Sequence, residues 1–303
     1  YLNRNSLLLN TWCSFLKEDV CISFPNFEQC REAIVLKIGF VSKPECARCI
    51  EVIKTIAQFL ESNGHEYVIE EGTAKEMKIE GEPLSKMKAD LIVTVGGDGT
   101  ALWTIQKTRL PVLPVNVGSL AFLSEVDPSN MFSYFARLLD GNFKIEERAR
   151  IKTTVNSRRL PDSLNEAVMK TMFLSKIRWF GVYIDNDFIQ NIRADGIIIA
   201  TPTGSTSYSL SVGGPILDPN VRAFIISYMA PFSLSARSMV VPSDSTIRVV
   251  TLDKGKSIML SLDGQEGVEV GFHDEISFTE SEFPAKFIRF NLDFYRAIRE
   301  KVL

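Results

Sequence analysis

The sequence LIVTVGGDGT at residues 91–100 decides the fold of the first half of this chain. Its five leading residues, all apolar or β-branched, predict a buried parallel strand. The three glycines predict a turn close to a ligand, because side chains there would keep phosphate oxygens away from the backbone N–H groups. We expect a helix at about 101–107, capped by Thr100. Asp98 would then set a carboxylate beside an anion, where it could take a proton or hold a metal.

The composition limits the classes of partner. The 303 residues suggest about two domains, and 45% hydrophobic with 23% charged residues is ordinary for a globular protein. A net charge of −3 argues against nucleic acid, so local helix N-termini and a few cations must hold any anionic ligand. No apolar run approaches the roughly 20 residues that span a bilayer. The LLL at 7–9 has no basic leader or cleavage site, so we expect no secretory signal, no membrane partner and a cytoplasmic location.

All cysteines lie within the first 49 residues, at Cys13, Cys21, Cys30, Cys46 and Cys49. Cys46 and Cys49 form a CxxC motif, but the other three have unhelpful spacing for a zinc site. We expect the cysteines to be reduced, as is usual in the cytoplasm. A local disulfide is the main alternative.

Strand and helix patterns alternate in the first half, which favours a parallel sheet covered by helices. We expect strands at 33–41, 67–70, 91–95 and 111–116, and helices at 44–63, 101–107 and 131–139. After about residue 141, short β-like runs predict a sandwich of two sheets. These runs are 151–155, 163–171, 179–184, 196–200, 223–226, 239–241, 246–252, 257–262 and 275–278, with hairpin loops expected at 185–187 and 253–256. The tail at 292–303 has a helical pattern and is expected to pack back on the first domain.

A second informative segment, DGIIIATPTGSTSYSLSVGGP, occupies residues 195–215. An apolar strand leads into a turn rich in hydroxyl groups, which suits phosphate and ribose hydroxyls. A solvated Ser/Thr loop is the alternative, but the adjoining buried strand favours a binding loop. Serine-nucleophile catalysis is disfavoured, because a G-x-S-x-G motif is absent and the chain has only His65 and His273. A P-loop ending at 255–257 also fails, because Val250 stands where its first glycine belongs.

Together these motifs resemble those of the NAD kinase family. The chain has its Gly-Gly-Asp-Gly motif at 96–99, its Asn-Glu pair at 165–166 and a close match to its second signature at 195–209. The stretch NVGSLAFL at 116–123 is similar to the family's asparagine-glycine-leucine-glycine-phenylalanine run, with Ala121 in place of glycine. PFSLSAR at 231–237 resembles its proline-histidine run, with Phe232 replacing the histidine. The resemblance covers about residues 35–290.

The resemblance implies an N-terminal Rossmann-like α/β domain followed by a β-sandwich domain, with the active site between them and a homodimer or homotetramer as the assembly. We expect the α/β domain with GGDGT at 33–142 and the all-β domain with the Asn-Glu and TPTGSTSYS motifs at 143–284. Residues 285–303 would form a C-terminal helical segment that returns to the α/β domain. Residues 1–32 are an unassigned extension.

The reaction implied by the resemblance is phosphorylation of the 2′-hydroxyl of the NAD adenosine ribose, which gives NADP. The donor would be ATP, another triphosphate or polyphosphate. Mg²⁺ or another divalent cation would accompany it, held mainly by donor phosphates and water with few protein ligands, none of which we assign to a residue. No prosthetic group is expected. Asp98 would be the catalytic base. Alternatives are another kinase with the Gly-Gly-Asp-Gly motif, such as a lipid kinase, and a non-catalytic NAD-binding regulator, which would gain nothing from a carboxylate beside phosphate.

The implied site residues come from both domains. The phosphate-binding loop would be Gly96, Gly97, Gly99 and Thr100. The substrate contacts would be Asp98, Gly99, Phe122, Asn165, Glu166, Lys176, Arg193, Asp195, Thr203, Thr206, Ser207, Tyr208, Ser209, Leu210, Ser211 and Gln265. Of these, Asn165 and Glu166 would contact ribose or adenine, and Phe122 could stack on a base. Arg193 and Lys176 would offset substrate charge, and Asp195 would contact the nicotinamide end.

Overall fold

The computed structural model describes residues 35–118, 121–172, 176–272, 274–291 and 294–301. The predicted N-terminal extension at 1–32, with Cys13, Cys21 and Cys30, lies outside the described residues, as does His273. The chain divides into two compact units. Unit 1 runs to Glu146 and resumes at Lys286, and unit 2 is Glu147–Ala285.

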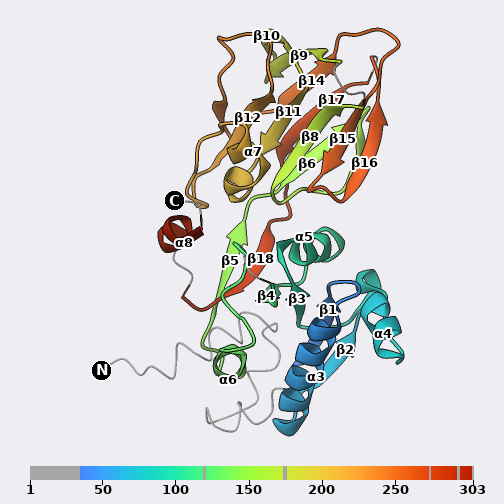
Figure 1. Cartoon of the computed structure of the whole chain (residues 1–303), viewed down its shortest axis with the longest axis vertical. Coiled ribbons are helices and arrows are strands. Elements are labelled where there is room, and N and C mark those ends of the chain that lie inside the picture. Colours follow the sequence, from blue (N-terminus) through green and yellow to red (C-terminus); the bar gives the residue numbers. More distant parts are fainter. Residues whose placement is uncertain (1–34, 119–120, 173–175, 273, 292–293, 302–303) are drawn as a thin grey trace. The chain divides into compact units, whose positions relative to one another are not determined.

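The sheet of unit 1 contains strands that are far apart in the sequence. Its order is β2-β1-β3-β4-β18-β5, and the neighbours from β2 to β18 pair in parallel. Figure 1 shows β18 and β5 side by side, although more than 130 residues separate them. The strands are β1 (Lys37–Ser42), β2 (Glu66–Ile69), β3 (Leu91–Gly96), β4 (Val112–Asn116), β5 (Lys144–Arg148) and β18 (Ala285–Arg289).

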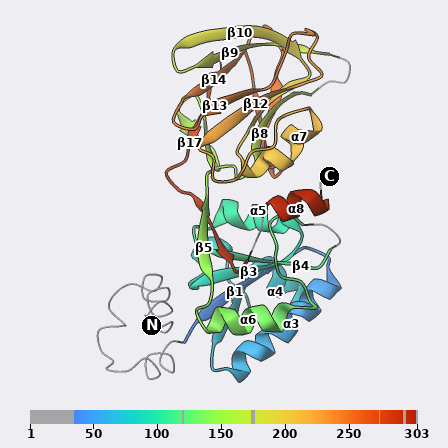
Figure 2. The same ribbon diagram turned by 90° about the vertical axis from the view of Figure 1, so that its left-hand side faces the viewer.

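Helices cover both faces of this sheet (Figure 2). Every residue of β3 is buried, and Leu91, Val93 and Val95 pack in one core with α3 and α6. Apolar residues recur at helical spacing along α3, which explains why that segment forms an amphipathic helix against the sheet. α5 packs against β3 and β4. The helices are α3 (Ala47–Ser62), α4 (Glu71–Met77), η2 (Leu84–Lys86), α5 (Asp98–Lys107), α6 (Met131–Leu139) and α8 (Phe294–Lys301).

Unit 2 is a sandwich of two antiparallel sheets around one apolar core. One sheet has the order β10-β9-β14-β17-β6-β7 and the other has the order β13-β12-β11-β8-β15-β16. The strands are β6 (Ile151–Val155), β7 (Arg158–Arg159), β8 (Glu166–Thr171), β9 (Arg178–Ile184), β10 (Asp187–Ala194), β11 (Gly196–Ala200), β12 (Ala223–Met229), β13 (Met239–Pro242), β14 (Ile247–Thr251), β15 (Ile258–Leu262), β16 (Glu266–Val270) and β17 (Ile276–Glu280).

The second signature segment covers the outer face of one of these sheets. It forms η3 (Thr203–Thr206) and α7 (Tyr208–Ser211). Tyr208, Val212 and Leu217 pack on a small core that contains Ile198 and Ile225. β11 and β12 are therefore covered on both faces, which is why they are buried along their whole length.

The predicted fold class is confirmed: an α/β unit, a β-sandwich unit and a C-terminal helix that belongs to the first unit. The predicted hairpin loop at 185–187 does join paired strands, β9 and β10. The one predicted at 253–256 is wrong, because β14 and β15 lie in different sheets and the loop crosses between them. Sequence periodicity did not predict the following helices and strands: α4, α7, β5, β7, β10, β16 and β18. No helix among the described residues is long and apolar enough to cross a membrane.

The expectation of reduced cysteines is wrong for the CxxC motif. Cys46 and Cys49 form a disulfide at the start of α3. The two cysteines lie one helical turn apart, so their side chains face each other across the first turn. Local geometry therefore brings the sulfurs together without any contribution from the rest of the fold.

Candidate functional site

The Gly-Gly-Asp-Gly motif forms the junction between β3 and α5. The N-cap of α5 is Gly97, which has extended backbone, so the helix begins at Asp98. The prediction that Thr100 caps the helix is wrong, because Thr100 lies inside the first turn. With the helix starting at Asp98, the backbone N–H groups of its first turn still point out of the N-terminal end of α5. An anion site requires such donors.

The three glycines of the motif have different roles in packing. A Cβ on Gly96 would lie 2.5 Å from Oγ1 of Thr100 and 3.0 Å from Cβ of Lys43. The close packing of Thr100 and Lys43 therefore requires glycine at position 96. A Cβ on Gly97 or Gly99 would meet no heavy atom within 4 Å. These two glycines border open space, which leaves their backbone accessible to a ligand.

The Asp98 carboxylate organises a remote loop. Its Oδ2 accepts a hydrogen bond from the backbone N–H of Phe122 at 2.7 Å, and its Oδ1 accepts one from Leu123 at 3.1 Å. Each carboxylate oxygen has a second acceptor position. Asp98 is partly exposed, so it can hold the loop and still receive a proton.

Two cations hold the same loop from its carbonyl side. Nζ of Lys301 donates to the carbonyl of Ala121 and lies 5.4 Å from the centroid of the Phe122 ring. Nη1 of Arg289 donates to the carbonyl of Leu123 at 2.5 Å. Burial lowers the pKa of Lys301, and the nearby Asp98 carboxylate opposes this shift. We call residues 121–123 with Asp98, Arg289 and Lys301 the Asp98 clamp.

In unit 2, a second aspartate positions the Asn-Glu motif. Asp263 has a buried side chain. It accepts hydrogen bonds from the backbone N–H groups of Leu164, Asn165 and Glu166 at 2.7, 2.8 and 3.0 Å. Asp263 and Gly264 both have positive φ, 51° and 68°, in the tight turn between β15 and β16. Aspartate and glycine tolerate this backbone best.

The Glu166 side chain has unused hydrogen-bonding capacity. It is 7% exposed, and it interacts with the Ser207 side chain and the Tyr208 backbone. Its Oε2 atom is buried and accepts no hydrogen bond. Burial, followed by the charge of Asp263, raises the pKa of Glu166 to about 7. Burial also raises the pKa of Asp263 to about 6, against the effect of the three N–H donors. Both carboxyl groups are therefore harder to ionise than they would be in water.

The second signature packs directly on the Asn-Glu motif. Thr201 donates through its N–H to the carbonyl of Asn165 at 2.9 Å and through Oγ1 to that of Leu164 at 2.6 Å. A Cβ on Gly204 would lie 2.0 Å from the Asn165 carbonyl oxygen, so only glycine fits there. Ser209 is fully buried, and its hydroxyl bonds to that of Ser227 at 2.9 Å.

The structure places the other predicted contacts as follows. Within unit 2, Oγ1 of Thr203 accepts from Nη1 of Arg148 at 3.3 Å, and the Arg193 guanidinium lies 5.5 Å from the centroid of the Phe232 ring. Thr206, Ser207, Tyr208 and Leu210 are partly exposed on η3 and α7, as is Asp195 between β10 and β11, whereas Ser211, Gln265, Lys176 and Arg193 are exposed. In unit 1, Phe122 is partly exposed. Their roles toward a ligand stay predictions.

Three residues that position these motifs were not predicted from the sequence: Asp263, Arg289 and Lys301. The Asp-Gly pair at 263–264 signals a turn, but no local pattern reveals which amides its carboxylate binds. Among the described residues, no group of three or more His, Cys, Asp or Glu side chains could hold a metal ion.

Comparisons with known proteins agree with these motifs. Residues 38–143 match the model of the ATP-NAD kinase N-terminal domain, and residues 164–290 match that of the ATP-NAD kinase C-terminal domain. The NAD kinase of Methanothermobacter thermautotrophicus is 41% identical over 275 residues, which cover 89% of this chain and 97% of that protein. The NAD kinase of Thermoplasma volcanium is 38% identical over 268 residues, which cover 88% and 98%.

Two solved structures are similar to this chain over most of its length. Yeast NADH kinase complexed with NADH has a TM-score of 0.80 at 26% identity, covering 88% of this chain and 87% of that one. An NAD kinase from Archaeoglobus fulgidus in complex with ATP has a TM-score of 0.71 at 26% identity, covering 88% and 97%. With both domain models matched along most of its length, this chain belongs to the ATP-NAD kinase family.

The glycines give a matched set of variants. Gly96→Ala should lower the free energy of unfolding by about 1–3 kcal/mol, because its methyl group overpacks against Thr100 and Lys43. Gly97→Ala and Gly99→Ala should fold with nearly wild-type stability but raise the KM for the phosphoryl donor. Chemical unfolding and steady-state kinetics would measure the two effects. Wild-type donor KM in both of the latter variants would contradict a phosphate-binding role for this turn.

Lys301→Met should loosen the Asp98 clamp while leaving the Asp98 carboxylate in place. The lost hydrogen bond to Ala121 costs roughly 1 kcal/mol, and kcat should fall more than the KM for NAD rises. Arg299→Met is the matched control, because Arg299 is exposed on the same helix. Equal kinetics for the two variants would show that Lys301 does not support Asp98.

Proposed function

We propose that this chain transfers the terminal phosphoryl group of ATP to the 2′-hydroxyl of the adenosine ribose of NAD, giving NADP. Membership of the ATP-NAD kinase family supports this reaction. The observation that carries it is the Asp98 carboxylate at the start of α5, flanked by two glycines that border open space. Incubating the protein with NAD, ATP and Mg²⁺ and assaying NADP with an NADP-specific dehydrogenase would test it.

In this proposal Asp98 is the general base. The ribose 2′-oxygen forms a bond to the terminal phosphorus as the bond from that phosphorus to the ADP oxygen breaks, and the hydroxyl proton passes to Asp98. Positioning and charge neutralisation supply most of the catalysis in phosphoryl transfer. The N–H groups at Gly97 and Gly99 bind the phosphate, while the Asp98 clamp keeps the carboxylate from rotating.

The Asn-Glu motif binds a pair of ribose hydroxyls. Glu166 offers a buried oxygen without a partner, which suits a hydroxyl donor, and Asn165 can both donate and accept. Thr203, Thr206, Ser207, Tyr208, Ser209, Leu210 and Ser211 line the dinucleotide site in this proposal, together with Asp195 and Gln265. Lys176 and Arg193 offset its charge, and Phe122 stacks on a base.

Mg²⁺ or another divalent cation reaches the site with the phosphoryl donor. In this proposal the cation is bound mainly by phosphate oxygens and water. Bound there, it would neutralise charge on the donor. The donor itself could also be another triphosphate or polyphosphate. A homodimeric or homotetrameric assembly and a cytoplasmic location complete the proposal and rest on the resemblance and on composition.

Asp98→Asn should lower kcat by about 10²–10⁴-fold, the usual contribution of a general base. Its amide nitrogen cannot accept from the loop N–H groups, so part of this loss could come from a looser loop. Lys301→Met loosens the loop but keeps the base, and it should lose far less activity. NAD affinity should stay within about tenfold of wild type, because the base acts chiefly on the transition state. An Asp98→Asn variant with most of its kcat would rule out the base assignment.

NAD binding should strengthen as pH rises from 6 to 8. Glu166 has a pKa of about 7, and its ionised form accepts two hydroxyl donors better than its protonated form does. Isothermal titration of NAD without ATP would measure the dissociation constant across this range. Glu166→Gln should bind roughly 10-fold or more weakly, given about 1.5–3 kcal/mol for a bond to a charged group. It should also lose the pH dependence.

The same experiment contains its own control. Asn165→Ala should weaken NAD binding but keep the pH dependence, because Glu166 still titrates. If Glu166→Gln retained the wild-type pH profile, the titrating group would be another residue and the ribose role of Glu166 would lose its support.

A further inference from the structure

The Cys46–Cys49 disulfide lies at the same edge of the unit 1 sheet as the glycine turn. β1 ends at Ser42, which pairs with Val95 of β3. The N–H of Lys43 then donates to the carbonyl of Val95 at 2.9 Å. Because β1 and β3 are parallel, the segments that follow them leave the sheet at one edge. Cys46 follows β1 by four residues.

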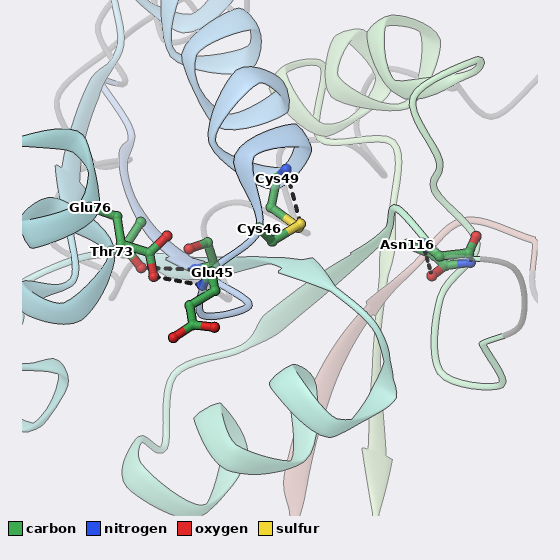
Figure 3. The surroundings of a disulfide bond; sticks show 8 residues. Glu45, Cys46, Cys49, Thr73, Glu76 and Asn116 are labelled. Carbon is green, nitrogen blue, oxygen red and sulfur yellow. Dashed lines mark hydrogen bonds between the residues drawn. A yellow bond between two sulfur atoms is a disulfide. The ribbon is translucent and has the colours of Figure 1, made fainter.

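The chain between β1 and the disulfide is fixed on two sides. On one side, the Cβ of Lys43 approaches Gly96 so closely that an added methyl group would lie 3.0 Å away. On the other side, the N–H of Glu45 donates to Oε1 of Glu76 in α4 at 2.9 Å (Figure 3). Glu45 also has a left-handed backbone, with φ of 55°, which a non-glycine residue keeps only when its surroundings hold it.

The two cysteines differ in their exposure to solvent. Cys49 is 1% exposed, whereas Cys46 is partly exposed at the N-cap of α3. Sγ of Cys46 accepts a hydrogen bond from the N–H of Cys49 at 3.2 Å. A thiolate at Cys46 would be stabilised by that N–H and by the helix N-terminus. A partly exposed cysteine beside a buried one is the arrangement in which a CxxC pair exchanges with other thiols.

We propose that Cys46–Cys49 is a reversible redox site that exchanges with dithiol reductants, and that opening it loosens the Gly96–Asp98 turn through residues 43–46. A thiolate of the reductant attacks Sγ of Cys46, the disulfide breaks, and Cys49 leaves and takes a proton. The second thiol of the reductant then displaces Cys46 and closes the reductant's own disulfide. Two electrons and two protons pass to the protein. Only the effect on turnover rests on the proposed function.

The test equilibrates the full chain with a series of reduced and oxidised dithiothreitol under argon. Alkylation and peptide mass mapping report the state of each cysteine, and hydrogen exchange reports the protection of residues 96–100. We expect Cys46 and Cys49 to open together while the fold stays intact by circular dichroism. Hydrogen exchange at residues 96–100 should become at least about threefold faster over the same range of dithiothreitol ratios in which the disulfide opens. NADP formation should fall over that range and recover on reoxidation.

Two variants assign the effect. The triple variant Cys13→Ser/Cys21→Ser/Cys30→Ser should still show both the opening of the disulfide and the faster hydrogen exchange at residues 96–100. The double variant Cys46→Ser/Cys49→Ser should show, at every dithiothreitol ratio, the exchange rate of the reduced protein. A pair that stays closed until the protein unfolds would overturn the redox site. A pair that opens without changing exchange at 96–100 would overturn the coupling. Failure to form NADP in every state would count against the proposed function alone, because alkylation and exchange do not depend on catalysis.

Discussion

The candidate site in unit 1 depends on one constraint. The backbone N–H groups of Phe122 and Leu123 donate hydrogen bonds to the Asp98 carboxylate. They join the end of β3 to a loop that follows β4, and they fix a carboxylate where two glycines leave the backbone accessible. Arg289 and Lys301 bind the carbonyl side of the same loop. The loop is therefore held through its N–H groups by an anion and through its carbonyls by cations, so the orientation of Asp98 depends on strand and helix segments distant in sequence.

Unit 2 uses the same kind of interaction with a different outcome. Asp263 also accepts backbone N–H groups from a remote segment, but it is buried and faces a second buried carboxyl, Glu166. Both groups have pKa values raised above their unfolded values, to about 7 and about 6. The folded state therefore binds more protons between roughly pH 4 and 7, and stability falls as pH rises through that window. A ligand hydroxyl that donates to Glu166 would relieve part of this cost.

Sequence patterns revealed the features that depend on neighbouring residues. The buried runs of β3 and β11 and the amphipathic α6 follow from hydrophobic periodicity, and the glycine and Asn-Glu motifs were recognisable from composition and order. Other features arise from contacts between distant segments. β18 is a short, mostly buried strand, and only its pairing with β4 reveals its place in the sheet. Lys301 and Asp263 are ordinary charged residues until the fold brings backbone groups to them. Thr100 was a reasonable cap, but the extended backbone of Gly97 starts the helix earlier.

Unit 2 interrupts unit 1 in the sequence, so the order of synthesis affects how the sheet of unit 1 folds. Unit 2 is one continuous segment, whereas unit 1 needs β18 to complete its sheet. A ribosome delivers the glycine motif early and delivers Arg289 and Lys301 only after all of unit 2. Until then the edge of β4 lacks its partner strand, and such an edge invites wrong pairing. A nascent chain can thus carry every residue of the Gly-Gly-Asp-Gly motif and still lack the cations that complete the Asp98 clamp, so the clamp forms only late in translation.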